Sequence, residues 1–329
     1  MTDSPGDAPA APRTSASASA DAMTVFDRAL VRRHRDRAAA AFADHAFLAD
    51  AVGDSLIDRL RDTTRRFPLA VELGCRTGRL APRLVGENGI ERVVGLEASP
   101  AMAARARAAG LPVAVAEEDM LPLADRSVDA VVSALALHWV NDLPGALVQV
   151  RRALRPDGLF LGAMIGGDTL IELRRAILET EAELRGGASP RLSPLADLRD
   201  AGALMQRAGF ALPVVDSETL TVDYADAFRL IADLRGMGAT AAHLSRDRGV
   251  PPRAFWPRVA ARYHALFAEP DGRIPATVEV LYLSGWAPDA SSQQQPLRPG
   301  SAAARLADAL GTAEASAGEP AAPGRRGKT

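Results

Sequence analysis

The residues best suited to chemistry stand at the end of one hydrophobic run. The segment "VVSALALHWVNDLPGAL", residues 131–147, begins with the apolar alternation of a strand inside a sheet. It then supplies an imidazole, an indole, an amide and a carboxylate in close succession. Because histidine titrates near neutral pH, His138 is a candidate general base.

Each of these residues also has a structural interpretation. His138 suits a packed position in which its polar atoms are satisfied. Trp139 belongs to a residue type that packs more often than it contacts a ligand. Asp142 is placed to cap the helix that Leu143 and Pro144 begin.

A second polar group follows the next apolar run. Asp168 comes after a pair of glycines that follow a strand expected at Leu159–Met164. Ligands of open α/β sheets bind outside the carboxyl ends of the strands. His138, Asn141 and Asp168 are therefore predicted to converge on one substrate group. The alternative is that the glycines only make a turn and Asp168 caps the following helix.

The elements that must position these residues alternate along the chain. Apolar runs predict strands, and runs with helical spacing or capping signals predict the helices between them. The expected strands are Leu69–Leu73, Arg92–Leu96, Val113–Ala116, Val128–Leu135, Leu159–Met164, Pro213–Val222 and Thr277–Trp286. The expected helices are Arg79–Val85, Pro100–Gly110, Asp142–Leu154, Leu195–Ala208, Ala225–Arg235 and Arg253–Phe267. This alternation predicts an α/β fold, a mostly parallel sheet with helices on both faces.

The first turn of this pattern is "VELGCRTGRL", residues 71–80. Gly74 and Gly78 permit a tight turn or a close approach of the backbone to a ligand. Glu97 ends the second strand, about 20 residues beyond the loop, where an acid holds a ribose hydroxyl. The alternative is a simple tight turn followed by a solvated strand end. The spacing is not the G-x-G-x-x-G of a dinucleotide site, which disfavours an oxidoreductase.

The loop resembles the acid-x-Gly-x-Gly-x-Gly segment of class I S-adenosylmethionine-dependent methyltransferases. Glu72, Gly74 and Gly78 match that pattern, and Arg76 stands where the middle glycine is usual. If the backbone there is left-handed, a non-glycine residue costs about 1 kcal/mol. The segment "AEEDMLPLADRSVDAVV", residues 116–132, resembles the third strand region of the same superfamily. The resemblance implies that Glu117 is the acid beside the adenine and that Met120 packs near the base.

Longer segments resemble one family within that superfamily. "SALALHWVNDLPGAL", "GAMIGGDTLIELR", "GGASPRLSP", "RAGF" and "LRGMGAT" are similar to the methyltransferase-fold assembly factor of respiratory complex I, as is "FDRALVRRHRDRAA" near the start. The resemblance covers roughly residues 24–286. It implies S-adenosylmethionine as cofactor and a complex I subunit as protein substrate, modified by methylation or arginine hydroxylation. It also implies a substrate or metal contact for Asp168 and a helical insertion between the last strands.

Two further functions stay open at this point. The segment "LRGMGATAAHLSRDRG", residues 234–249, also resembles the O-methyltransferase of biotin synthesis, which esterifies a malonyl group on acyl carrier protein. That family normally lacks the His-Trp-Val-Asn-Asp run, so it ranks second. The other alternative is a non-catalytic assembly chaperone that binds S-adenosylmethionine only structurally.

Composition sets the remaining expectations. The net charge of −2 indicates no nucleic-acid partner, and no apolar run reaches the roughly 20 residues of a membrane span. The single cysteine, Cys75, excludes an intramolecular disulfide, and no metal-ligand spacing is present. We expect a cytoplasmic bacterial protein that can attach to the inner membrane through a partner. The predicted organisation is a disordered tail (1–22), a helical segment (23–66), a methyltransferase-like domain (67–286, divided after 164) and a second tail (287–329).

Overall fold

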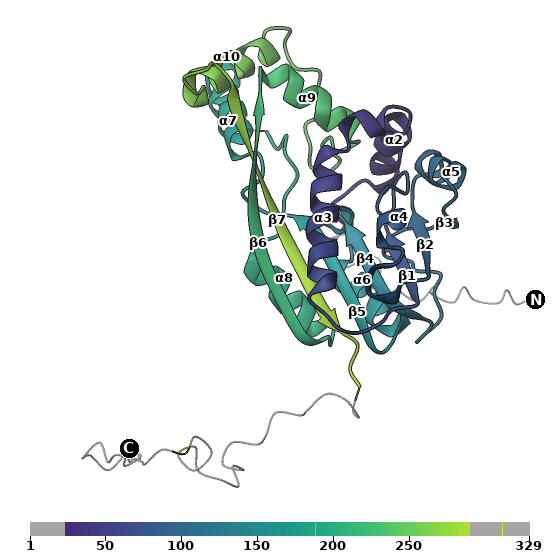
Figure 1. The fold of residues 1–329 in the computed structure, drawn as a ribbon. Helices are drawn as coiled ribbons and strands as arrows, with labels where there is room; N and C mark the ends of the chain where they lie inside the picture. The colour runs from purple at the N-terminus through teal and green to yellow at the C-terminus, as the bar shows by residue number, and fades with distance from the viewer. Residues whose placement is uncertain (1–23, 188, 290–310, 312–329) are drawn as a thin grey trace, which may run out of the picture. The chain divides into compact units, whose positions relative to one another are not determined.

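A seven-stranded sheet in the order β3-β2-β1-β4-β5-β7-β6 forms the centre of the protein. The computed structural model describes residues 24–187, 189–289 and 311. All neighbouring strands run parallel except β7, which is antiparallel to both β5 and β6 (Figure 1). The strands are β1 Leu69–Leu73, β2 Arg92–Glu97, β3 Val113–Val115, β4 Val128–Ala134, β5 Leu154–Ile165, β6 Ala211–Tyr224 and β7 Ile274–Trp286. The prediction of a mostly parallel sheet is confirmed.

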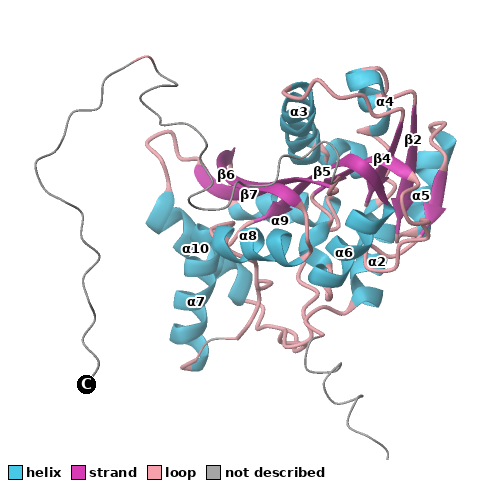
Figure 2. Cartoon of the chain, turned by 90° about the horizontal axis from the view of Figure 1, so that it is seen from below, coloured by secondary structure: helices cyan, strands magenta, loops and turns pink. Residues whose placement is uncertain are grey.

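Helices cover both faces of this sheet, as Figure 2 shows, with α3 and α4 on one side and α6 and α8 on the other. The helices are α2 Arg28–Ala38, α3 Phe47–Arg61, α4 Ala81–Leu84, α5 Pro100–Ala108, α6 Leu143–Ala153, α7 Ile171–Arg185, α8 Leu198–Arg207, α9 Ala227–Gly236 and α10 Phe255–Phe267. Three short 3-10 helices, η1 Phe42–His45, η2 Glu87–Gly89 and η3 Leu137–Trp139, join some of them. The expected insertion between the last strands is present as α9 and α10.

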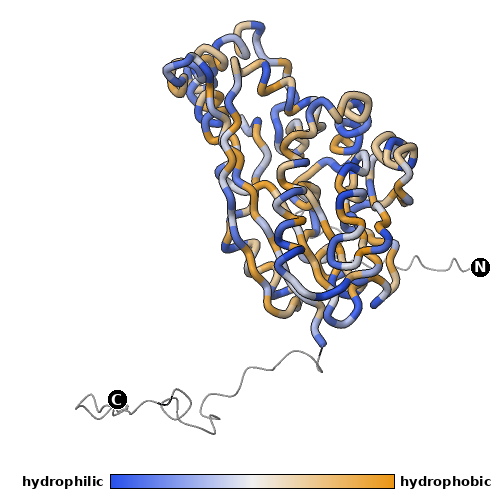
Figure 3. The backbone as a smooth tube through the Cα atoms, viewed as in Figure 1, coloured by the Kyte–Doolittle hydropathy of each residue, from blue (hydrophilic) through white to orange (hydrophobic). Residues whose placement is uncertain are grey.

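Alternation along the strands builds two cores, one on each face. Ala130 and Val132 of β4 pack toward α3 and α4, whereas Val128 and Val131 of the same strand pack toward α6 and α8. Side chains of a strand point alternately to opposite faces, so a strand buried on both sides must be apolar throughout. Figure 3 shows this as hydrophobic colour along the central strands. Both cores hold the carboxyl ends of β1 and β4 in place for the site.

The local capping signals confirm two predicted helix starts. The hydroxyl of Ser99 accepts a hydrogen bond from the backbone nitrogen of Met102 and caps α5. The carboxylate of Asp142 accepts one from the backbone nitrogen of Gly145 and caps α6. The structural interpretation of Asp142 is therefore confirmed.

One predicted helix boundary is wrong, and so is the alternative interpretation in which Asp168 caps the next helix. The expected helix Arg79–Val85 is shortened to α4, because the turn that follows the glycine loop continues to Leu80 and left-handed Gly86 follows the helix. α7 does not begin after Asp168: Leu170 is its N-cap, is left-handed at φ 56° and supplies no side-chain cap. Most of both predicted tails lies outside the described residues.

Candidate active site

The glycine loop leaves β1 with the conformation that its sequence predicts. Gly74 and Gly78 have φ values of 73° and 75°. A Cβ atom on Gly74 would lie 2.2 Å from the Cβ of Ala136, so no larger residue fits there without a shift. Arg76 adopts φ 51°, so the backbone is left-handed at the position where this residue replaces the usual glycine. Its guanidinium donates to the backbone oxygen of Leu135 at 2.7 Å.

Glu97 ends β2 as a fully buried carboxylate beside this loop. It accepts hydrogen bonds from the backbone nitrogens of Arg76 at 2.9 Å and Ser99 at 2.8 Å. Arg35, on α2, adds a third contact at 3.3 Å. The carboxylate is thus fixed at the end of β2, where an acid in this fold type can meet a vicinal diol.

A second acidic group follows β3 and is also covered by α2. Glu117 pairs with Arg28 at 2.5 Å and Arg32 at 3.0 Å. Glu118 is fully buried and pairs with Arg35 at 2.7 Å and with Arg28. These two arginines hold the pKa of Glu118 well below its usual range, although burial alone would raise it. Glu117 was predicted from the sequence, whereas Glu118 was not, because its only signal was its place in an acidic run.

Met120 is 73% exposed in this conformation. Its backbone nitrogen donates to the backbone oxygen of Glu117, which closes a turn at this point. A role beside the adenine stays a prediction.

Buried polar atoms without hydrogen-bond partners lie on β1, on the loop and on α2. They are Oε2 of Glu72, Nε of Arg76 and Nη2 of Arg35. Burial raises the pKa of Glu72 to about 8, so this side chain is protonated in the folded protein at neutral pH. A cavity of about 20 Å³ remains at the loop, room for a single water molecule. The acids and unpartnered atoms suit a nucleoside chemically, but Arg28 and Arg35 of α2 already pair with Glu97 and Glu118 in this structure.

His138 lies in η3 and lines a much larger cavity of about 890 Å³. The backbone nitrogen of Ile165 approaches its Nδ1 at 3.5 Å, the long limit of a hydrogen bond. Burial, with the positive charges of Arg76 and Arg35, lowers the pKa of His138 to about 3. The imidazole is therefore neutral at physiological pH and a weak proton acceptor in this state.

Asn141 and Asp168 do not converge with His138. The side-chain oxygen of Asn141 accepts from the backbone nitrogens of Val25 and Phe26, and its nitrogen donates to the oxygen of Phe26. Asn141 therefore anchors the segment that leads into α2. Asp168 is exposed, and its backbone nitrogen donates to Glu279 at 3.0 Å. Their predicted direct roles in catalysis would need a rearrangement of this state.

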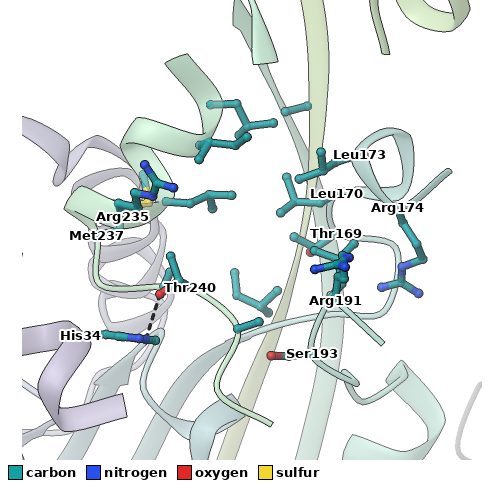
Figure 4. A pocket seen from close by; sticks show the side chains of 18 of the residues that line it. His34, Thr169, Leu170, Leu173, Arg174, Arg191, Ser193, Arg235, Met237 and Thr240 are labelled. Carbon is teal, nitrogen blue, oxygen red and sulfur yellow. Dashed lines mark hydrogen bonds between the residues drawn. The ribbon is translucent and has the colours of Figure 1, made fainter. Parts of the chain in front are cut away.

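The large cavity lies between the N-terminal helix and the second half of the chain. Figure 4 shows His34 and Thr240 on one wall and Thr169, Leu173 and Arg191 on the other. Its surface is mainly apolar and includes Trp139 at the β4 end. The ring of His34 bonds the hydroxyl of Thr240 at 2.8 Å, which ties α2 to the segment after α9. This pair was not predicted from the sequence, because its members are 206 residues apart.

α2 therefore lies between the acids that follow β2 and β3 and the large cavity. Arg28 and Arg35 face the acids after β2 and β3, whereas Leu30, His34 and Arg37 line the large cavity. Arginines spaced three or four apart on a helix fall on one face, but only tertiary contacts show what that face meets. The described residues contain no group of three or more His, Cys, Asp or Glu placed to hold a metal ion. No described helix has the length and apolar composition to cross a membrane.

Comparison with known proteins shows which family the chain belongs to. A family model described as a methyltransferase domain matches residues 71–162. The mitochondrial arginine-hydroxylase NDUFAF5 of Danio rerio is 37% identical over 87% of this chain and 89% of its own length. The chain belongs to the NDUFAF5 family. The malonyl-[acyl-carrier protein] O-methyltransferase of Methylovorus sp. (strain MP688) is also similar, at 35% identity over 82% of this chain and 92% of its own.

A solved structure agrees on the fold. The YcgJ protein from Bacillus subtilis aligns with a TM-score of 0.50 at 16% identity, over 72% of this chain and 99% of its own. With the strand order above, this confirms the class I methyltransferase fold for a member of the NDUFAF5 family. The membership confirms the resemblance that the strand-four and Gly-Gly-Asp segments carried in the sequence.

Proposed function

We propose that this protein binds S-adenosylmethionine and modifies a side chain of a protein substrate during assembly of respiratory complex I, with arginine hydroxylation as the reaction. The observation that carries the proposal is the juxtaposition of two sites across α2. Buried acids at the ends of β2 and β3 suit a nucleoside, and a large cavity beside His138 suits a substrate side chain. The reaction type follows the printed name of relatives that align over most of this chain.

The residues present fit the cofactor. Glu97 would accept hydrogen bonds from the ribose hydroxyls, and Glu117 or Glu118 would face the adenine. Gly74 and Gly78 would allow the loop backbone to approach the methionine end. When bound, S-adenosylmethionine supplies an electrophilic methyl group on a sulfonium. Because Arg28 and Arg35 now hold these acids, α2 must withdraw or rotate to admit it.

The cavity residues would serve the substrate. Its apolar lining excludes water from the group that enters, and this strengthens electrostatic interactions there. His138 is neutral and can accept or donate one hydrogen bond at the carboxyl end of β4. Hydroxylation adds one oxygen atom, so it requires an oxidant such as dioxygen and a two-electron reductant. Methylation instead breaks the sulfonium carbon–sulfur bond and releases a proton from the substrate nitrogen.

Mass spectrometry of complex I subunits tests the proposal. Subunits are isolated from cells with the intact gene, without it, and with the His138→Ala variant. A gene-dependent gain of about 16 Da on an arginine supports hydroxylation, and about 14 Da indicates methylation instead. The enzymatic function is contradicted if complex I fails to assemble without the gene and its subunits carry no mass change when the gene is present. That result would favour a non-catalytic chaperone.

One observation favours a second candidate, a malonyl-carrier O-methyltransferase. Arginines such as Arg174 and Arg235 line the cavity, and a guanidinium pairs well with a carboxylate. The relative from Methylovorus carries this activity in its name. Incubation with malonyl-acyl carrier protein and S-adenosylmethionine decides: a gain of about 14 Da on the acyl group supports this candidate, and an unchanged acyl group removes it.

A further inference from the structure

The large cavity carries a strong excess of positive charge. Among the described residues that line it there is one carboxylate, Asp247. Six arginines line it: Arg37, Arg174, Arg191, Arg235, Arg246 and Arg248. A substrate arginine that enters alone would therefore meet like charges, which is unfavourable in a cavity with apolar walls.

Only two of the six arginines are neutralised within the described part of the chain. Arg191 pairs with Glu181 at 2.5 Å and with Asp247 at 2.9 Å. Arg246 lies 3.6 Å from Asp27. Arg37, Arg174, Arg235 and Arg248 make no ion pair with another described residue.

Arg174 is the most constrained of these unpaired arginines. Its Nε is buried without a hydrogen-bond partner, and an Nη2 atom reaches only the backbone oxygen of Gly167 at 3.4 Å. The hydroxyl of Ser193, also part of the cavity wall, is buried without a partner as well. Figure 4 shows both residues on the side of the cavity that holds Thr169 and Arg191. Unpartnered polar atoms at one wall indicate that a ligand group satisfies them there.

The other unpaired arginines are spread around the cavity. Arg37 lies on α2, Arg235 on α9, and Arg248 on the segment between α9 and α10, and all three are exposed. A small anion would pair with one of them. An extended segment that carries several carboxylates would pair with more than one, while apolar side chains of that segment contact the apolar walls.

We propose that the cavity recognises an acidic and apolar segment of the substrate protein, whose carboxylates pair with Arg174, Arg235 and Arg248 and so offset the charge of the target arginine. This inference rests on the proposed function, because it takes the target to be an arginine. It adds a requirement on the substrate: carboxylates must lie within a few residues of the modified side chain.

Peptide binding to the full chain tests this directly. The probes are fluorescein-labelled 15-residue peptides with a central arginine, flanking leucines and three glutamates at varied positions, each with twins that carry glutamine or lysine. Fluorescence anisotropy measures their affinity without any turnover. We expect the best glutamate peptide to bind about tenfold or more tightly than its glutamine twin, with a preference that weakens in 0.3 M salt.

Variants assign the preference to the cavity. The triple variant Arg174→Met, Arg235→Met, Arg248→Met should bind glutamate and glutamine peptides within about threefold of each other. Each single variant should lower the ratio in part, which keeps the test valid if the triple variant unfolds. The control is Arg199→Met on α8, an exposed arginine that is not part of the cavity lining, and it should retain the full preference.

Other outcomes overturn the inference. Equal affinity for the glutamate and glutamine peptides, or tighter binding of the lysine twin, contradicts it. A third outcome assigns the cavity to an acyl chain and also contradicts the inference. In that outcome dodecanoate binds, the arginine variants bind it more weakly, and the peptides show no charge preference. Charge preference without modification in cells contradicts only the proposed reaction, whereas modification without charge preference contradicts only this inference.

Discussion

Replacing Arg35 by methionine should loosen the contact between α2 and the nucleoside-side acids. Arg35 lies 2.7 Å from Glu118 and 3.3 Å from Glu97, and both carboxylates are fully buried. Removing one partner of a buried ion pair costs about 3–5 kcal/mol. We expect a value near the lower end, because Glu97 keeps two backbone donors and Glu118 keeps Arg28. At roughly 2–4 °C per kcal/mol, the melting temperature should fall by about 6–12 °C.

The same change should favour the cofactor. The free protein would no longer have to break a charge-assisted hydrogen bond to Glu97, which contributes about 1.5–3 kcal/mol. Titration calorimetry should therefore show S-adenosylmethionine binding about 10- to 100-fold more tightly to Arg35→Met than to the unchanged protein. Arg32→Met is the matched control on α2. Its side chain is 44% exposed, and among the described residues its ion pair is with Glu117, so neither quantity should change much. Weaker binding to Arg35→Met would refute the reasoning, since it would show that Arg35 contacts the bound cofactor.

Four further predictions follow from the same contacts. Glu97→Gln should weaken the binding of S-adenosylmethionine, measured by calorimetry, by about 1.5–3 kcal/mol. Unchanged affinity would show that Glu97 is not part of the cofactor site. Arg76→Gly relieves about 1 kcal/mol of left-handed strain, but it loses the hydrogen bond to the backbone oxygen of Leu135 and raises the conformational entropy of the unfolded chain. The melting temperature should therefore fall slightly, and a clear rise would show that the strain is the larger effect. Burial raises the pKa of Glu72 to about 8, so the folded state holds a proton that the unfolded chain releases, and this stability is lost as pH rises from about 4.5 through 8. Urea unfolding at pH 5 to 8 should show a flatter profile for Glu72→Gln, and an unchanged slope would contradict the shift. Withdrawal of α2 to admit the cofactor would take Arg35 away from His138 and raise the basicity of the imidazole. His138→Ala should then lower substrate modification by about 10²- to 10⁴-fold with little change in cofactor affinity, and a folded variant at full rate would end its catalytic role.

The sequence predicted the parts of this structure that depend on local patterns. Apolar alternation marked β1, β2 and β4 to within a residue or two, and the capping residues Ser99 and Asp142 marked the starts of α5 and α6. These signals are short in range, because a strand buried on both faces and a capped first turn leave their pattern in adjacent residues. Helix ends were less certain wherever a left-handed residue such as Leu170 intervened.

The site was predicted only in part, because its decisive contacts join distant segments. Arg28 and Glu118 are 90 residues apart, and the arginines of α2 have the spacing of an ordinary solvated helix face. Asn141 followed a strand end, as an active-site residue would, yet it binds the backbone of Phe26. A residue type at a strand end identifies the mouth of the sheet but not which neighbour the side chain meets there.

The charge state of His138 shows why that distinction matters for chemistry. Its position at the end of β4 was predicted, but a base near pH 7 also requires that few positive charges lie nearby. Arg76 reaches this region because its left-handed backbone directs the guanidinium to Leu135, and Arg35 reaches it because α2 pairs with Glu97 and Glu118. Burial, together with both arginines, lowers the pKa of His138 and keeps the imidazole neutral. Any withdrawal of α2 that admits a cofactor would also remove Arg35 from this neighbourhood, so the affinity for the cofactor and the basicity of His138 depend on the same helix.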